Sequence, residues 1–481
     1  MSILKKFFRD TIIYGLASVT PRLVSFILVP IHTSSLDTAL YSINTNYYVY
    51  AVFLNALLTM GMETAFFRYF SGESDKMKVV SSSFVMLALS SLIFLIATWP
   101  ASSFLAAFFG FPDPYFIKLL ILTIVFDTLV VIPFAYLRAT GRSLMFAGFR
   151  ILNVLILLLL NVWLLLILPS QSGDQVLFSG WIDRTADVSD IFVANVVASI
   201  FTFLLCLPLI FKVKITWDST LIRKMFVYGW PVMVAGFAYA INENLDKLFI
   251  SHYLGDDVNG MYAGCYKLGV FMSLYVMTFR LGAEPFFFNQ YGKEGAESLY
   301  SRILTWFVIF GCLCMLLVTG FVDIFAGLLL KRVSYKAALD IVPIILLANM
   351  FLGVYNNLSV WYKLKDKTRI GMLISVFGAL ITIVLLPVLL PVLGYMGAAY
   401  TTLIVYFFMA ATSYLMGRKY YPVSYETAKV LTYLGLTATI SMLSFYFFRG
   451  NILANISVLI LFTLFVTVRE GLFKRGLVDK T

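Results

Sequence analysis

Long apolar stretches recur along the whole chain and constrain its fold more than any other feature. A helix needs roughly 20 apolar residues to cross the hydrocarbon core of a bilayer, and fourteen stretches meet this need. The chain is 61% hydrophobic and 13% charged, whereas a soluble protein carries about 25% charged residues. We therefore predict an all-α polytopic membrane protein with about 14 transmembrane helices. The expected spans are 11–31, 43–62, 79–100, 116–135, 144–168, 191–211, 225–246, 260–282, 302–322, 339–361, 370–393, 395–417, 428–447 and 452–468.

The distribution of basic residues predicts how these spans are oriented. Cytoplasmic loops carry an excess of Lys and Arg. Placing the N-terminus, with Lys5, Lys6 and Arg9, in the cytoplasm puts most of the 36 basic residues on that side, and only the basic loop 331–336 departs from this pattern. We predict a multi-pass protein of the bacterial cytoplasmic (inner) membrane with both termini cytoplasmic. The net charge of +11 then reflects the excess of Lys and Arg in the cytoplasmic segments, and no nucleic-acid partner is expected. The span 11–31 has no small-residue cleavage site after it and is expected as the first transmembrane helix.

Two related segments predict an internal duplication. Gly61-Met62-Glu63-Thr64-Ala65-Phe66-Phe67 resembles Gly282-Ala283-Glu284-Pro285-Phe286-Phe287-Phe288 at an offset of 221 residues. The alternative is chance similarity between Phe-rich segments, but each match falls at the same place in the order of spans. Six spans separate the copies, so they share one orientation, which is typical of parallel repeats in transporters. We predict two six-helix lobes related by a parallel pseudo-twofold, 1–212 and 213–420, and two additional helices with a cytoplasmic tail in 421–481.

Charged side chains inside the apolar spans are the candidates for a functional site. A charge at the bilayer centre costs about 2.5–3.5 kcal/mol or more, so it normally faces a partner or a water-filled cavity. We predict that the basic residues at such positions line a cationic cavity that neutralises an anion, because guanidinium groups suit phosphate well. These residues are Arg22 and Lys267 first, then Arg150 and Arg280; the acids at comparable depth, predicted to couple or gate transport, are Asp127, Glu243, Asp246, Glu63 and Glu284.

Structural roles remain open for several of these charges. Arg280 and Glu284, like Glu243 and Lys247, are four residues apart and lie on one helical face, so each pair is an alternative candidate for an intrahelical ion pair. Lys247 also has the reach to extend its ammonium group to the outer headgroups. A bridge between Arg22 in the first span and Asp127 in the fourth is a further alternative.

No catalytic or metal-binding motif accompanies the spans. The four cysteines fall inside apolar runs, and only two histidines occur. We find no glycine-rich phosphate loop, no nucleophile elbow and no metal-ligand spacing. The sequence therefore predicts a protein that is not an enzyme and that has no metal site and no cofactor.

Several short motifs resemble those of a known family. They are Tyr228-Gly229-Trp230-Pro231, Asn242-Glu243-Asn244-Leu245-Asp246-Lys247-Leu248-Phe249-Ile250, Tyr253-Leu254-Gly255, Gly260-Met261-Tyr262-Ala263, Tyr266-Lys267 and Gly397-Ala398-Ala399-Tyr400-Thr401-Thr402-Leu403-Ile404. In this order, they resemble polysaccharide flippases of the multidrug/oligosaccharidyl-lipid/polysaccharide exporter (MOP) superfamily, over most of the chain. One departure is Lys247, where members of the family often have Arg.

The resemblance implies two six-helix bundles and transport by alternating access. It implies a flippase that moves an undecaprenyl-diphosphate-linked oligosaccharide repeat unit from the cytoplasmic to the outer leaflet, for O-antigen, lipopolysaccharide or other polysaccharide assembly. The implied partners are the lipid-linked oligosaccharide, membrane lipids, and the polysaccharide polymerase and glycosyltransferases of the same pathway.

Three alternatives remain at the level of sequence. Lipid II flippases of peptidoglycan synthesis also have fourteen spans, but they tend to place more arginines in the first two spans, where only Arg22 lies deep here. Multidrug exporters couple to cations through membrane acids, and the first span here has none, although Asp127 and Glu243 keep this alternative open. A membrane-embedded polymerase or glycosyltransferase would need a large outer loop with catalytic acids, and the longest such loop here is 169–190, with Asp183 and Asp187.

Overall fold

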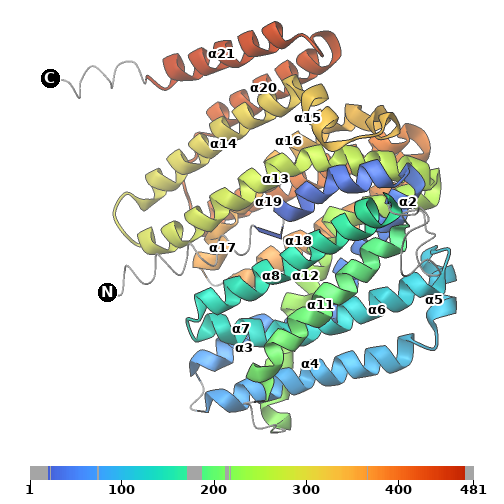
Figure 1. The fold of residues 1–481 in the computed structure, drawn as a ribbon. Helices are drawn as coiled ribbons and strands as arrows, with labels where there is room; N and C mark the ends of the chain where they lie inside the picture. The colour runs from blue at the N-terminus through green and yellow to red at the C-terminus, as the bar shows by residue number, and fades with distance from the viewer. Residues whose placement is uncertain are drawn as a thin grey trace. The chain divides into compact units, whose positions relative to one another are not determined.

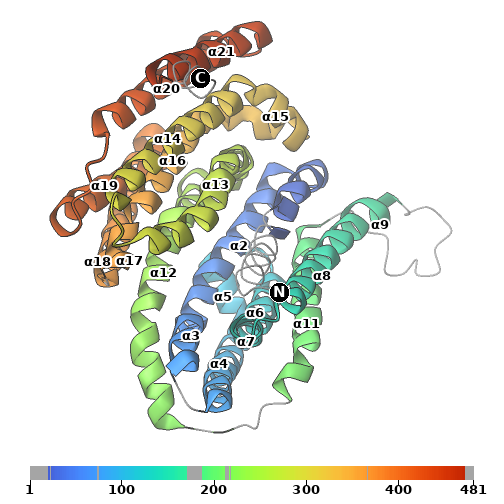
Figure 2. The same ribbon diagram turned by 90° about the vertical axis from the view of Figure 1, so that its left-hand side faces the viewer.

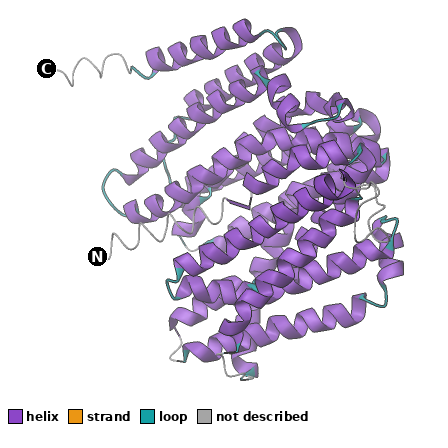
Figure 3. Cartoon of the chain, in the orientation of Figure 1, coloured by secondary structure: helices purple, strands orange, loops and turns teal. Residues whose placement is uncertain are grey.

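The computed structural model of the chain is built from helices joined by short connections (Figure 3). It describes residues 20–21, 23–72, 75–170, 187–211, 216, 218–365 and 367–471, and these form no strand. By packing, the chain divides into two compact units, Met1–Gly260 and Met261–Thr481. This is a division by contact and not by ancestry, so the lobes 1–212 and 213–420 and the terminal segment 421–481 stay a prediction.

The first unit contains the helices that position the candidate site. In chain order they are α2 (Thr38–Leu58), α3 (Met62–Gly72), α4 (Lys76–Thr98), α5 (Ser102–Phe109), α6 (Pro114–Leu129), α7 (Val131–Ala139), α8 (Ser143–Val162) with the π-helical turn η1 (Trp163–Ile167) and α9 (Leu168–Ser170), α11 (Val188–Ile210) and α12 (Ser219–Leu254). Helix α13 (Asp256–Gln290) begins in this unit.

The second unit contains the rest of α13 and eight further elements. They are α14 (Ala296–Gly320), α15 (Val322–Leu329), the 3₁₀ helix η2 (Val333–Ile341), α16 (Val342–Leu358), α17 (Val360–Leu364), α18 (Thr368–Leu393), α19 (Tyr395–Tyr420), α20 (Thr427–Phe447) and α21 (Ile452–Arg469).

The predicted polytopic membrane architecture is confirmed. Among the described residues, 12 helices are long and apolar enough to cross a membrane. Two of the expected spans are not in this set. Most of 11–31 lies outside the described residues, with a shorter apolar helix over Leu23–Ser35, and 260–282 lies within the 35-residue α13.

A similar order of helices occurs in both units, as the predicted duplication requires, although the 3₁₀ helix η2 between α15 and α16 has no counterpart between α5 and α6. In each, a long helix (α4 or α14) is followed by an eight-residue helix (α5 or α15). The next long helix is broken near its end, at Val130 between α6 and α7 and at Ser359 between α16 and α17. The two Phe-rich segments differ locally, because Gly61 lies in the break between the helices α2 and α3, whereas Gly282 lies inside the helix α13.

Local sequence signals explain where the site-forming helices of the first unit begin. Asp113 caps α6 by accepting a hydrogen bond from the backbone N–H of Tyr115, and Pro114 occupies the first turn, where a missing N–H costs nothing. Asp187 and Asp190 form a reciprocal capping box at the start of α11. Helices α6 and α8 both pack against α11 (Figures 1 and 2).

A backbone-to-backbone contact fixes the break between α2 and α3. Met60 and Gly61 adopt φ of 51° and 64°, the left-handed region that favours glycine. A Cβ at Gly61 would lie 2.2 Å from the carbonyl oxygen of Gly229 in α12, and a Cβ at Gly229 would lie 2.6 Å from that of Met60. Glycine at both positions therefore allows α12 to approach the α2–α3 break closely. Glu63 follows this break in the first turn of α3, so the contact positions it.

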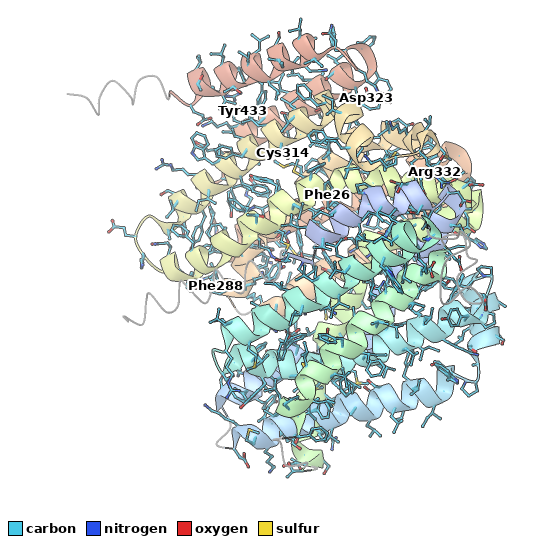
Figure 4. The ribbon with its side chains drawn as sticks, viewed as in Figure 1. Phe26, Phe288, Cys314, Asp323, Arg332 and Tyr433 are labelled. Carbon is cyan, nitrogen blue, oxygen red and sulfur yellow. The ribbon has the colours of Figure 1, made fainter. Side chains whose placement is uncertain are left out.

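In the second unit, the two C-terminal helices pack on α14 (Figure 1). The side chain of Tyr433, labelled in Figure 4, donates a hydrogen bond of 2.7 Å to Glu470, and Lys429 forms a 2.7 Å ion pair with the same carboxylate. Burial alone would raise the pKa of Glu470, but the hydrogen bonds from Lys429 and Tyr433 outweigh it and hold this pKa below its ordinary value. This cluster links α20 to the end of α21.

The crossing of α12 against the α2–α3 break predicts a contrast between two glycines of α12. We expect Gly229→Ala to lower the free energy of unfolding by about 1–3 kcal/mol, because the added methyl group meets the Met60 carbonyl. Gly236→Ala is the matched control, since a Cβ there meets nothing within 4 Å, and it should change stability by no more than about 1 kcal/mol. Denaturation in detergent, followed by fluorescence, measures both. Equal effects of the two substitutions would contradict the close contact.

Candidate functional site

A polar cavity of about 540 Å³ lies within the first unit. Charged, amide and hydroxyl side chains line it, although the helices that carry them are otherwise apolar. The lining residues are Pro21, Asn55, Glu63, Asp127, Val130, Val131, Phe134, Arg138, Phe146, Arg150, Asn153, Leu157, Asn195, Ala198, Ser199 and Thr202.

Helical spacing explains why these side chains converge. Asn195, Ser199 and Thr202 are four and three residues apart, so they form one polar stripe along the apolar helix α11. Arg150 and Asn153 are three residues apart and lie on one face of α8. Because α6 and α8 both pack against α11, the stripe, the α8 face and Asp127 of α6 meet in the cavity.

Hydrogen bonds hold the polar wall of the cavity in place. The Ser199 hydroxyl donates to Oδ1 of Asp127 at 2.7 Å. Nδ2 of Asn153 donates to Oγ1 of Thr202 at 2.8 Å and to the Ala198 carbonyl at 3.1 Å. Nδ2 of Asn195 donates to the Tyr48 hydroxyl at 2.6 Å and to the Ile191 carbonyl at 2.8 Å. The wall is therefore preorganised by contacts among α6, α8, α11 and α2.

Arg150 provides one of the positive charges of the cavity. Its guanidinium carbon lies 4.8 Å from the ring centre of Phe134 and 6.0 Å from that of Phe146, within the range of cation–π attraction. Asp127 lines the same cavity as Arg150. No described residue accepts a hydrogen bond from the Arg150 guanidinium group, so its donors remain available to a ligand in the cavity.

A second opposite-charge pair also lines the cavity. Arg138, near the end of α7, forms an ion pair with Glu63 at the start of α3. The Arg138 guanidinium carbon lies 4.9 Å from the ring centre of Phe67. The described lining thus contains two arginines and two carboxylates, and the cavity is polar and not purely cationic.

The structure brings three of the predicted site residues together, Arg150, Asp127 and Glu63. Glu243 and Asp246 lie on α12, outside the residues that line the cavity. Arg22 lies outside the described residues, so its predicted cavity role and its bridge to Asp127 stay predictions.

The partner of Lys247 differs from the expectation. Its Nζ lies 2.8 Å from the Asp246 carboxylate and donates to the backbone carbonyl of Glu243 at 3.0 Å, and not to the Glu243 carboxylate. Both members of the Lys247–Asp246 pair are buried, so the ammonium group does not extend toward the surface. Adjacent residues can pair in this way because the Lys side chain is long enough to fold back on its own helix.

The remaining predicted residues belong to the second unit. Lys267 lies half-buried on α13. Arg280, on the same helix, borders a small pocket with Lys363, Asn356 and Asn357. The side chain of Glu284 lies outside the described residues. The functional roles of these three residues stay predictions.

Sequence reasoning missed Arg138 and the uncharged lining residues Asn55, Asn153, Asn195, Ser199 and Thr202. Arg138 follows the expected span 116–135, so the sequence analysis treats it only as one of the basic residues that predict orientation. The spacing of Asn195, Ser199 and Thr202 in an apolar segment was the available signal. A stripe of this kind normally faces a polar neighbour, because an unpaired polar group in hydrocarbon is costly.

Comparison with known families identifies the class of protein. The model of a family described as "Polysaccharide biosynthesis protein" matches residues 7–289, more than half of the chain. The chain belongs to this family. A second family model, MatE, matches residues 231–388. No curated protein matches the chain in sequence.

Solved structures of a lipid flippase and of MOP-superfamily transporters share the fold. The lipid II flippase MurJ in an inward closed conformation matches with a TM-score of 0.72 and 16% identity, over 97% of this chain and 100% of that chain. An inward-facing multidrug resistance MATE transporter matches with a TM-score of 0.64 and 14% identity, over 83% and 94%. A transporter from Pyrococcus furiosus, described as having reversed binding-pocket polarity, matches with a TM-score of 0.61 and 13% identity, over 86% and 95%.

The chain belongs to the polysaccharide biosynthesis family and has the fold of MOP-superfamily transporters. These findings confirm the predicted resemblance and the multi-pass membrane architecture. The structures that share this fold are described as transporters and as a flippase.

The position of Asn153 predicts a contrast in thiol reactivity along α8. We expect Asn153→Cys to react with a water-soluble maleimide at least about tenfold faster than Leu155→Cys, because a thiol reacts as its thiolate, which needs water. Leu155, 43% exposed on the apolar surface, is the matched control. Labelling of purified protein, read by mass spectrometry, measures both rates. The native Cys206, Cys265 and Cys312 are buried, and unsubstituted protein gives the background. Equal rates would show that the cavity is not accessible to water.

Proposed function

We propose that this chain is a flippase for an undecaprenyl-diphosphate-linked oligosaccharide repeat unit. It would move the lipid from the cytoplasmic to the outer leaflet of the bacterial inner membrane for lipopolysaccharide, O-antigen or other polysaccharide assembly. One observation carries the proposal: a member of the polysaccharide biosynthesis family encloses a preorganised polar cavity among membrane-spanning helices.

The polar head group is the part of such a substrate that opposes its movement across the bilayer. The polyprenyl tail is as apolar as the bilayer, but phosphates and sugar hydroxyls lose several kcal/mol per unsatisfied group in hydrocarbon. A cavity of about 540 Å³ is typical of a ligand site and holds the part of the head next to the lipid. Its donors and acceptors replace water during the crossing.

Arg150 is the proposed contact for the diphosphate. Its donors are available to a ligand in the cavity, and a guanidinium group binds phosphate oxygens in a bidentate manner.

Arg22, Lys267 and Arg280 are proposed as further cations along the substrate path. Glu63, Asp127, Glu243, Asp246 and Glu284 are proposed to couple or gate transport, and both chain termini are proposed to be cytoplasmic. The polymerase and glycosyltransferases of the same pathway are the proposed protein partners, and membrane lipids surround the chain.

A second candidate is lipid II flipping. It is supported by the likeness to the MurJ structure over 97% of this chain. The match of the MatE model to residues 231–388 similarly supports a cation-coupled multidrug exporter. These candidates differ in substrate, so a transport assay that offers each substrate separates them.

The test is transport of a fluorescent undecaprenyl-diphosphate oligosaccharide in proteoliposomes. We expect the wild type to move it and Arg150→Gln to move it about ten- to a hundredfold more slowly, because charge-assisted hydrogen bonds are lost. Arg142→Gln is the matched control, since Arg142 is exposed at the start of α8 and does not line the cavity. It should transport at the wild-type rate.

Two results would contradict the proposal. Wild-type transport by Arg150→Gln would remove the cavity from the substrate path. Transport of lipid II or of a cationic drug in place of the oligosaccharide lipid would favour the corresponding alternative.

A further inference from the structure

We propose that the wall of the cavity formed by Asp127, Asn153 and Asn195 is a subsite that recognises the hydroxyl groups of the first sugar of the lipid-linked head. This inference rests on the proposed function and deepens it, because it assigns head-group specificity to three residues that do not contact the diphosphate.

The wall presents acceptor oxygens to the cavity. Oδ1 of Asp127 already accepts from Ser199, whereas Oδ2 accepts from no described residue. The amide nitrogens of Asn153 and Asn195 donate to the backbone carbonyls of Ala198 and Ile191. A carbonyl oxygen needs an N–H donor, so these bonds fix the orientation of both amides. Their Oδ1 atoms accept from no described residue, and three oxygens therefore remain available.

A row of acceptors is selective for donors. A carboxylate and an amide oxygen cannot hydrogen-bond to a fully ionised phosphate oxygen, because neither partner carries a proton. Sugar hydroxyls do carry protons, and each can donate to one of these oxygens. A ligand without hydroxyl groups would leave the wall unpaired, and such sites reject analogues strongly.

The same cavity also carries donors, on the face of α8 that bears Asn153. The guanidinium group of Arg150 lies against Phe134. Because Arg150 and Asn153 lie one turn apart on one face of α8 and both line the cavity, a group bonded directly to a phosphate held by Arg150 is placed to reach the wall. A sugar diphosphate has this order of chemistry, with acceptor oxygens on the phosphate followed by hydroxyl donors on the sugar.

Charge favours a neutral sugar over a cation at this wall. Arg138 forms an ion pair with Glu63, and Arg150 lines the same cavity as Asp127. A bound cation would add a positive charge beside Arg150, and like charges close together in low dielectric repel strongly. A sugar satisfies the same oxygens without that repulsion.

The test compares two lipids on the full chain in detergent. The ligands are undecaprenyl diphosphate and the same lipid bearing one hexose, offered as glucose, galactose and N-acetylglucosamine forms. We expect the wild type to bind at least one hexose form about tenfold more tightly than the bare diphosphate. Asp127→Asn should reduce this preference about tenfold and should not weaken binding of the bare lipid, because the variant removes a negative charge from the cavity that receives the diphosphate. Arg150→Gln should weaken the binding of both lipids.

A second variant keeps the test valid if Asp127→Asn does not fold. Asn153→Ala removes one acceptor, and Asn244→Ala is its matched control, since Asn244 lies on α12 and bonds to its own helix at the Ala240 carbonyl. Only Asn153→Ala should reduce the hexose preference.

The outcomes separate this inference from the proposed function. Equal binding of bare and hexose-bearing lipid by the wild type would overturn the sugar subsite and leave the flippase proposal standing. Binding of neither lipid would overturn the proposed function itself. Asp127→Asn could instead keep the hexose preference and lose a dependence of lipid binding on sodium. That result would overturn the sugar subsite and assign the carboxylate to a coupling cation.

Discussion

The cost of placing a charge among apolar helices governs the arrangement of the first unit. An ionised side chain in low dielectric is stable only beside an opposite charge, a hydrogen-bond partner or water. Asp127 accepts a hydrogen bond from Ser199 in the cavity that Arg150 also lines, and Glu63 pairs with Arg138. The polar groups of six helices, α2, α3, α6, α7, α8 and α11, meet in one cavity, and the outer faces of the same helices stay apolar for the lipid.

Ordinary packing positions this cavity. Tyr47 of α2 stacks on Phe192 of α11 with ring centres 3.8 Å apart, and its hydroxyl group lies 2.8 Å from Oγ1 of Thr123 in α6. This buried contact fixes the rotation of α11 about its axis, and hence the direction of the polar stripe. At another end of the cavity, the glycine contact between the α2–α3 break and α12 places Glu63. Rigid support of this kind is what a preorganised binding wall requires.

The sequence predicted the spans well, because apolar length is a local property. It also selected Arg150, Asp127 and Glu63 by their depth in the spans. It did not predict that these three residues share a cavity, since that depends on how each helix is rotated and on which helices pack together. The ends of the helices were harder to predict. Helix α12 runs from Ser219 to Leu254, well beyond the apolar window 225–246. It is longer because Asp218 caps its start and because polar residues at both ends of the window continue the helix. The partner of Lys247 depended on the rotamer of a flexible side chain, which no spacing rule determines.

The uncharged lining residues show why depth alone is an incomplete criterion. Asn153, Asn195 and Ser199 attract no attention as single residues, because amides and hydroxyls are tolerated in membrane helices when they bond to their own backbone. Here their donors are used within the protein, and the oxygens of the two amides remain. The balance of donors and acceptors, and not net charge, distinguishes a site for a sugar diphosphate from a simple anion site.

The central claim is that the head of a lipid-linked sugar occupies the cavity bounded by α6, α8 and α11. The most direct measurement is a cryo-electron microscopy structure of the full chain with undecaprenyl-diphosphate oligosaccharide in lipid nanodiscs. The account predicts head-group density in this cavity, with a phosphate beside Arg150 and a sugar ring against Asp127, Asn153 and Asn195. Density for the head group at another site, with this cavity filled only by water, would contradict it.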